Sequence, residues 1–118
     1  MKSTFILLCA AAAILIVTLI RNRTMEEKIK AHIQAGALVL DVRTAAEFMG
    51  GHFSTAINIP YEQVENRLSE IGSLKENPIV VYCHAGSRAT VAEQMLTRNG
   101  YTNVINAGGY DKIKKFDK

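Results

Sequence analysis

The residues best suited to chemistry form one six-residue segment, Cys83-His84-Ala85-Gly86-Ser87-Arg88, between an apolar run and a helical pattern. A cysteine placed there lies at the amino end of a helix, where unpaired backbone amides and the helix dipole present partial positive charge. The small residues at 85–87 allow the loop to curl so that its amides converge on one anion, and Arg88 adds a full charge. We therefore expect Cys83 to be a catalytic nucleophile held as a thiolate. The expected substrate-binding residues are His84, Ala85, Gly86, Ser87 and Arg88.

Cysteine usage narrows the chemistry of this thiol. The chain has two cysteines, and Cys9 lies in a long apolar run, so it is a poor disulfide partner for Cys83. A lone cysteine in a folded domain is an inert buried thiol, a metal ligand or a nucleophile. No second cysteine or tight His/Cys cluster completes a zinc site, so we predict no metal and no cofactor. Composition alone leaves the inert and the reactive interpretations open, and the position of Cys83 between a strand and a helix start favours the reactive one.

Short apolar runs and helical patterns alternate along the rest of the chain. The predicted strands are 37–40, 56–59, 79–82 and 102–105. The predicted helices are 24–36, 44–51, 61–71, 88–99 and a short charged helix that ends at Phe116. Such alternation indicates a mainly parallel sheet covered by helices on both faces. Ligands bind beyond the carboxyl ends of the strands in these sheets, which points to the residues after Leu40 and Tyr82.

Capping signals define several of these helices. Thr24 to Glu27 and Thr44 to Glu47 each place a hydroxyl three residues before a carboxylate, as in a capping box at a helix start. Gly36 is expected to end the first helix in a left-handed conformation. The residues expected to face inward from the helix over 88–99 are Val91, Met95 and Leu96.

Polar residues follow the first predicted strand and so lie near the expected pocket. We assign supporting roles to Asp41 and Arg43. Arg43 is expected to pair with Glu47 on the next helical turn, and Asp41 to accept hydrogen bonds from loop amides. Asn58 is expected to satisfy backbone groups.

The N-terminal segment has a different composition from the remainder. Residues 3–20 contain no charged residue and lie between Lys2 and Arg21. Eighteen helical residues span about 27 Å, close to the hydrocarbon thickness of a bilayer. We predict a transmembrane anchor over residues 1–23 and a folded domain over residues 24–118. A cleaved export signal is the alternative.

The charge pattern argues against nucleic acid as a partner. The formal net charge is +3, but residues 24–118 contain 11 Lys or Arg and 11 Asp or Glu, so the excess lies at the ends of the apolar run. The basic residues after that run favour a cytoplasmic domain, with the periplasmic side as the alternative. A C-terminal basic cluster, interrupted by two aspartates, is expected to be a solvated helix face. Its members are Lys112, Lys114, Lys115 and Lys118.

Several motifs in the same order resemble the rhodanese-like family over about residues 37–110. They are Asp41-Val42-Arg43 with Glu47, the block 51–60, the strand and loop at 80–89, and the closing strand and Gly-Gly turn at 100–110. The resemblance implies a three-layer rhodanese-like α/β fold, with a mainly parallel sheet of four to five strands flanked by helices. It is strongest to the small exported single-domain enzymes of bacteria, which places the anchor in a bacterial inner membrane. It also implies that His52 braces the turn into the second strand.

The resemblance further implies an activity. A rhodanese transfers the outer sulfur of thiosulfate, or of a related donor, to its cysteine as a persulfide, and then passes it to cyanide or a thiol. The implied partners are therefore a small sulfur-donor anion and a thiol acceptor, for which a thioredoxin-like protein is a candidate. Six residues from Cys83 through Arg88 fit this branch, because phosphatases and arsenate reductases of the same fold use a loop one residue longer. Those enzymes, and a non-catalytic docking module, are the alternative functions.

Overall fold

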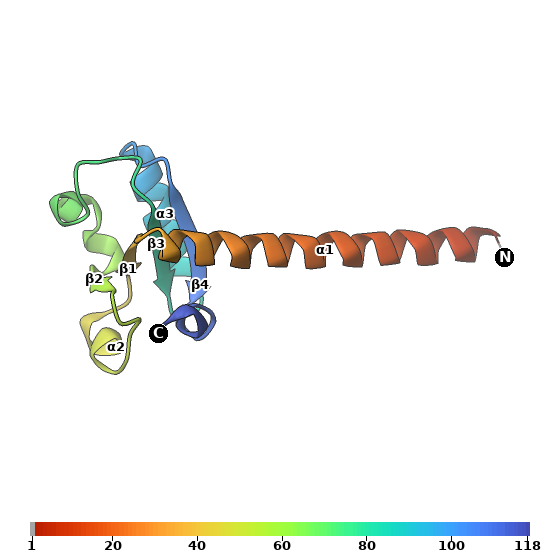
Figure 1. The fold of residues 1–118 in the computed structure, drawn as a ribbon, viewed down its shortest axis with the longest axis horizontal. Helices are drawn as coiled ribbons and strands as arrows, with labels where there is room; N and C mark the ends of the chain where they lie inside the picture. Colours follow the sequence, from red (N-terminus) through yellow and green to blue (C-terminus); the bar gives the residue numbers. More distant parts are fainter. Residues whose placement is uncertain (1) are drawn as a thin grey trace.

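The computed structural model describes residues 2–118 and contains one four-stranded sheet. All neighbouring strands are parallel, as predicted, and their order is β2-β1-β3-β4 (Figure 1). The strands are β1 (Leu38–Asp41), β2 (Ile57–Asn58), β3 (Ile79–Cys83) and β4 (Val104–Gly109). β3 is buried along its whole length because it lies between two strands and under helices on both faces.

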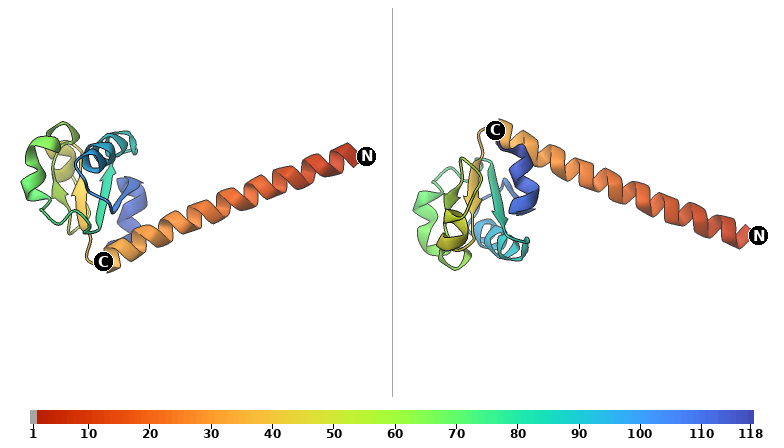
Figure 2. Two further views of the ribbon diagram at one scale, coloured as in Figure 1. Left: turned by 90° about the horizontal axis from the view of Figure 1, so that it is seen from above. Right: turned by 90° about the horizontal axis from the view of Figure 1, so that it is seen from below.

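Helices cover both faces of the sheet, which gives the predicted three layers (Figure 2). Side chains alternate along β3, so Val81 and Cys83 face one layer while Val80 and Tyr82 face the other. The Cys83 side is covered by α3 (Ser87–Arg98) and by the 3₁₀ helices η1 (Tyr61–Gln63) and η2 (Glu65–Glu70). The opposite side is covered by the end of α1 (Lys2–Gln34), by α4 (Tyr110–Ile113) and by the 3₁₀ helix η3 (Lys114–Phe116). A short helix, α2 (Ala45–Met49), follows β1.

Helix α1 runs without interruption through the predicted capping box at Thr24, so the expected helix start there was wrong. The Thr24 hydroxyl donates backward to the carbonyl of Ile20 at 2.8 Å, because residues on both sides of it are helical. The helix ends as predicted at Gly36, which has φ +80°. The amides of Gly36 and Ala37 donate to Ile33 and His32, the paired bonds of a Schellman motif.

The N-terminal part of α1 projects away from the domain (Figure 1). Phe5 is 68% exposed and Leu15 is 60% exposed, whereas Ile29 is buried against the sheet. The apolar part is long and apolar enough to cross a bilayer, a criterion that an N-terminal signal sequence also meets.

Other differences from the predicted elements are local. The helix expected over 61–71 is divided into η1 and η2, with a non-helical Arg67 at φ −126° and ψ 29°. The Arg67 guanidinium bonds Gln63 and Glu70 on either side, which holds this bent conformation. In α3 the fully buried residues are Ala89, Ala92 and Leu96. Val91, expected to face inward, is 37% exposed because the stripe that meets the sheet lies on the small side chains.

The last strand also differs in extent from the prediction. β4 begins at Val104 and continues to Gly109, whereas the prediction was 102–105. The Thr102 amide donates to the carbonyl of Lys75, so this residue belongs to the turn before the strand. The extension carries the two glycines, 108 and 109, to the level of the end of β3, where Cys83 is paired with Gly109.

Candidate active site

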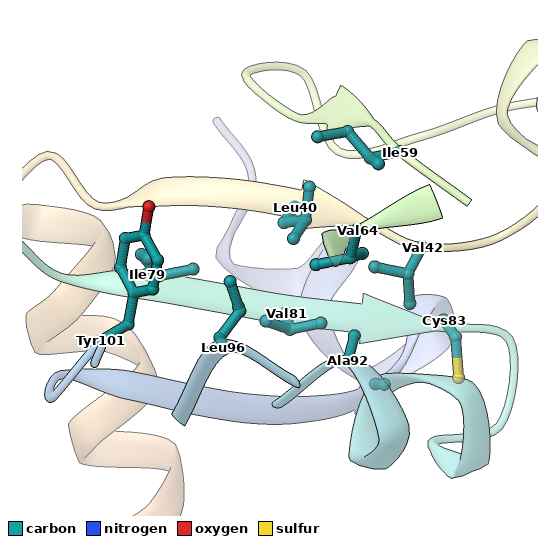
Figure 3. Close-up of a cluster of buried hydrophobic side chains, with 11 residues drawn as sticks. Leu40, Val42, Ile59, Val64, Ile79, Val81, Cys83, Ala92, Leu96 and Tyr101 are labelled. Carbon is teal, nitrogen blue, oxygen red and sulfur yellow. The ribbon is translucent and has the colours of Figure 1, made fainter. Parts of the chain in front are cut away.

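Cys83 is the last residue of β3 and has no exposed surface. It completes the aliphatic cluster on the α3 side of the sheet, but its sulfur is directed away from Val42 and toward the start of α3 (Figure 3). There the backbone amide of Gly86 donates to Sγ at 2.9 Å. The thiol is therefore buried and has a loop amide as its polar partner.

The loop between Cys83 and α3 turns sharply through Gly86. Gly86 has φ +105°, a left-handed conformation that disfavours any residue with a Cβ, and it forms the N-cap of α3. The loop also packs against the end of β4. A Cβ on Gly86 would lie 3.5 Å from Gly108 Cα, and a Cβ on Gly109 would overlap the carbonyl oxygen of His84. The glycine pair of β4 thus fixes the path of the loop.

The remaining predicted substrate-binding residues lie around this loop. His84, Ala85 and Ser87 are exposed to solvent. Arg88 is partly buried and its guanidinium forms two parallel bonds to the carboxylate of Glu47, at 2.7 and 3.0 Å. The predicted pairing of Arg43 with Glu47 was therefore wrong, because the arginine of α3 occupies that carboxylate.

Glu47 belongs to two interactions at once. It closes a capping box with Thr44, as predicted, and it holds Arg88 from a different element. The bonds from Arg88, then those from Thr44, outweigh the cost of burial and lower the pKa of Glu47 to about 2. The same contacts raise the pKa of Arg88. This pair joins α2 to the first turn of α3.

Arg43 instead pairs with Asp41 inside the domain. The guanidinium lies 2.7 Å from the Asp41 carboxylate, and the side chains are 6% and 0% exposed. Burial of Arg43 disfavours its charged form. The hydrogen bonds to Asp41 and the negative charge of Asp41 outweigh this effect, so the pKa of Arg43 is raised. Asp41 also accepts the amide of Arg43 at 2.9 Å, which confirms the expected bond to a loop amide. This pair supports the loop after β1 and is almost wholly buried.

Three further polar side chains bond the backbone near the ends of the strands. Asn58 donates to the carbonyls of Asp41 and Arg43, as predicted. The ring of His52 stacks on Phe48, and its Nδ1 lies 2.8 Å from the Phe48 carbonyl, so it braces the segment before β2. Sequence reasoning missed the Tyr82 hydroxyl, which accepts the Phe53 amide at 3.0 Å. Burial raises the pKa of that hydroxyl.

Two hollows adjoin the loop. The larger, about 980 Å³, has Ala85 and Gly86 in its wall and lies between α1, α3, β4 and the C-terminal segment. The smaller, about 410 Å³, has His84 in its wall and lies between α2 and α4. Within residues 2–118 no group of three or more His, Cys, Asp or Glu side chains is placed to hold a metal ion.

Comparison with known proteins decides the family. The model of the rhodanese-like domain matches residues 25–116. The chain belongs to the rhodanese-like family. Among its relatives, the thiosulfate sulfurtransferase PspE of Escherichia coli is 38% identical over 74 residues, which cover 63% of this chain and 71% of that protein. A sulfurtransferase of Allochromatium vinosum is 36% identical over 72 residues, 61% of this chain and 65% of that protein.

Solved rhodanese structures share the fold described above. A rhodanese with anions from E. coli is 36% identical, has a TM-score of 0.63, and aligns over 65% of this chain and 91% of its own. The human single-domain sulfurtransferase TSTD1 is 25% identical with a TM-score of 0.67 over 78% of this chain and 94% of its own. The predicted rhodanese-like α/β fold is thereby confirmed. This rhodanese is an enzyme of the thiosulfate sulfurtransferase type.

Proposed function

We propose that the protein accepts sulfane sulfur from thiosulfate or a related donor as a persulfide on Cys83, and passes it to a thiol or cyanide acceptor. One observation carries this proposal: the loop amide of Gly86 donates to the sulfur of Cys83 at 2.9 Å, at the amino end of α3. The name of the E. coli relative, a thiosulfate sulfurtransferase, supports thiosulfate as a donor.

The proposed reaction has two steps, and both are nucleophilic displacements on sulfur. The Cys83 thiolate attacks the outer sulfur of thiosulfate and forms a new S–S bond. The original S–S bond of thiosulfate breaks, and its electron pair leaves with sulfite. An acceptor thiolate then attacks the outer sulfur of the persulfide, takes it, and restores the Cys83 thiolate. Throughout, the Gly86 amide and the α3 dipole stabilise the negative charge at the cysteine.

We propose that Cys83 is the catalytic residue and that residues 84–88 form the substrate cradle. Asp41 and Arg43 act beneath it as supports, since their pair is buried. Because Arg88 is held by Glu47, its contribution is to fix the first turn of α3, from which the cradle amides project.

We also propose that residues 3–20 anchor the enzyme in a bacterial inner membrane by a single span. The exposed apolar part of α1 supports this proposal. The basic flank after the span favours a cytoplasmic domain, and protease treatment of spheroplasts distinguishes this from a periplasmic one. The acceptor is a thiol, for which a thioredoxin-like protein is suitable, and nucleic acid is not a partner.

The test is the intact mass of the full chain in detergent after exposure to thiosulfate. We expect a gain of about 32 Da, one sulfur atom, on Cys83. Cys83→Ser should abolish the gain, and Cys9→Ser, the matched control, should keep it. An unchanged mass in the wild-type chain with every sulfur donor would contradict the proposal and favour a docking module.

A further inference from the structure

The cation that the cradle supplies is already occupied. The two terminal nitrogens of the Arg88 guanidinium donate to the carboxylate of Glu47, at 2.7 and 3.0 Å. Each side chain is about a third exposed. The Glu47 carboxylate offsets the positive charge that Arg88 would otherwise present to an anionic donor. The walls of the two hollows beside the loop differ in whether their described cations have such a partner.

The charges that line the smaller hollow cancel. Arg43 pairs with Asp41, Glu47 pairs with Arg88, and Asp111 lies 3.2 Å from Lys114. Apart from these charged side chains, the ring-bearing side chains of the wall are the imidazole of His84 and the phenol of Tyr110. This hollow offers little attraction for a dianion.

The larger hollow has a different balance. Its wall contains Lys28 and Lys112, and among the side chains that the structure describes no carboxylate forms an ion pair with either. Lys115 in the same wall is neutralised by Glu26 at 2.6 Å. Among the side chains of this wall that the structure describes, Glu93 is the carboxylate without an ion pair, and it lies about 9 Å along α3 from the cradle. The two unpaired lysines therefore outnumber the unpaired carboxylate in this wall.

Lys112 lies against the backbone that borders the reactive sulfur. The aliphatic chain of Lys112 covers Gly108, with Cδ 3.5 Å and Nζ 4.0 Å from the position a Cβ would take there. Gly108 in turn contacts Gly86, whose amide donates to Cys83 Sγ. Lys112 is thus connected to the cradle through the contact between these two glycines, and it lines the larger hollow together with Ala85 and Gly86.

We propose that Lys112, assisted by Lys28, recognises the anionic group of the sulfur donor at the cradle end of the larger hollow. This inference rests on the proposed sulfur transfer and names the site of the donor's anionic end. The ammonium makes a charge-assisted contact with an oxyanion such as the sulfonate end of thiosulfate. The outer sulfur of the donor then faces the wall formed by Ala85 and Gly86. Lys112 is a specificity-determining residue in this scheme, and it takes no proton from the reacting atoms.

Binding without turnover is the first test. Thiosulfate is titrated by calorimetry into the full chain in detergent carrying Cys83→Ser, which cannot accept sulfur. Adding Lys112→Gln should weaken thiosulfate binding about fivefold, the effect of one exposed charge-assisted contact. Lys112→Arg should restore it to within about twofold, since the charge is kept. Lys114→Gln is the matched control, because Lys114 is already paired with Asp111 and lies outside the larger hollow.

Kinetics on chains with an intact Cys83 supply the second readout. Lys112→Gln should raise KM for thiosulfate about fivefold and leave kcat unchanged, because the contact is lost equally from the bound donor and the transition state. A structural role for Lys112 would lower kcat or the melting temperature instead. The inference is overturned if thiosulfate binds the Lys112→Gln and Lys114→Gln chains equally well. It is also overturned if the Cys83→Ser chain binds no thiosulfate while the wild type gains sulfur. If the wild type gains no sulfur, the proposed function itself fails, whatever the binding result.

Discussion

Replacing Glu47 by Gln isolates the charge that joins α2 to α3. Gln keeps the size of the side chain, and its one oxygen can still accept the Thr44 amide in the capping box, so the change removes the negative charge and one of the two hydrogen bonds from Arg88. A Glu47 pKa of about 2, against its ordinary 4.5, corresponds to about 3 kcal/mol. Glu47 and Arg88 are 33% and 28% exposed, and screening by water reduces the expected loss of stability to about 1–2 kcal/mol.

The pH dependence of this loss has a definite sign. The pKa of Glu47 is lower in the folded chain, so the pair stabilises the fold fully above pH 4.5 and loses its effect as the pH falls to about 2. We therefore expect the Glu47→Gln chain to be less stable than the wild type at pH 7 and equally stable at pH 2. Other carboxylates titrate in both chains, so the difference between the two curves isolates Glu47.

Urea unfolding followed by the near-ultraviolet circular dichroism of the buried tyrosines measures this difference in the full chain in detergent. Glu62→Gln is the control, because no described side chain bonds the Glu62 carboxylate, and it should leave stability unchanged at every pH. A Glu47→Gln deficit that stays constant from pH 7 to pH 2 would refute the reasoning. It would mean that Glu47 acts through its shape, and that Arg88 is free in solution to bind the donor.

Three further predictions concern the buried support of the loop. Gly109→Ala should destabilise the domain by about 1–3 kcal/mol and abolish the mass gain with thiosulfate, because its Cβ would displace the carbonyl of His84. Asp41→Asn should cost about 3–5 kcal/mol in urea unfolding, since it leaves a buried Arg43 guanidinium without its counter-ion. Tyr82→Phe should lower the unfolding free energy by about 1–3 kcal/mol, because a buried backbone amide loses its acceptor, and it should leave the mass gain intact.

Much of the sheet could be predicted because its signals are local. Apolar runs between breakers marked all four strands, and Gly36 marked the end of α1. The helix start at Thr24 could not be placed correctly by the same method. The same four residues, a threonine followed three positions later by a glutamate, occur both at helix starts and inside helices. Which of the two they form depends on whether the preceding segment is helical. Here Ile20 supplies a helical carbonyl, and the Thr24 hydroxyl bonds it.

The extent of η2 and of β4 depended on contacts that a local pattern does not contain. The break at Arg67 is accompanied by bonds to side chains on both sides of it, and the extension of β4 to Gly109 comes from pairing with the end of β3. Both contacts form only when distant segments or long side chains meet. The spacing of apolar residues along the sequence therefore located η2 and β4 but gave the wrong first and last residues for them.

The charged residues of the site show why residue types alone did not determine the pairs. Two arginines and two carboxylates lie near the cradle, and either pairing balances the charge. Burial decides between them: Arg43 lies under the rings of Tyr82 and Tyr110, where a neighbouring carboxylate is required, so it takes the buried Asp41. Glu47 is then left for Arg88, and the cradle loses its own cation to a structural bond. Because Glu47 offsets the charge of Arg88, a cation outside the loop adds attraction for an anionic donor, which is the reason for assigning that task to Lys112.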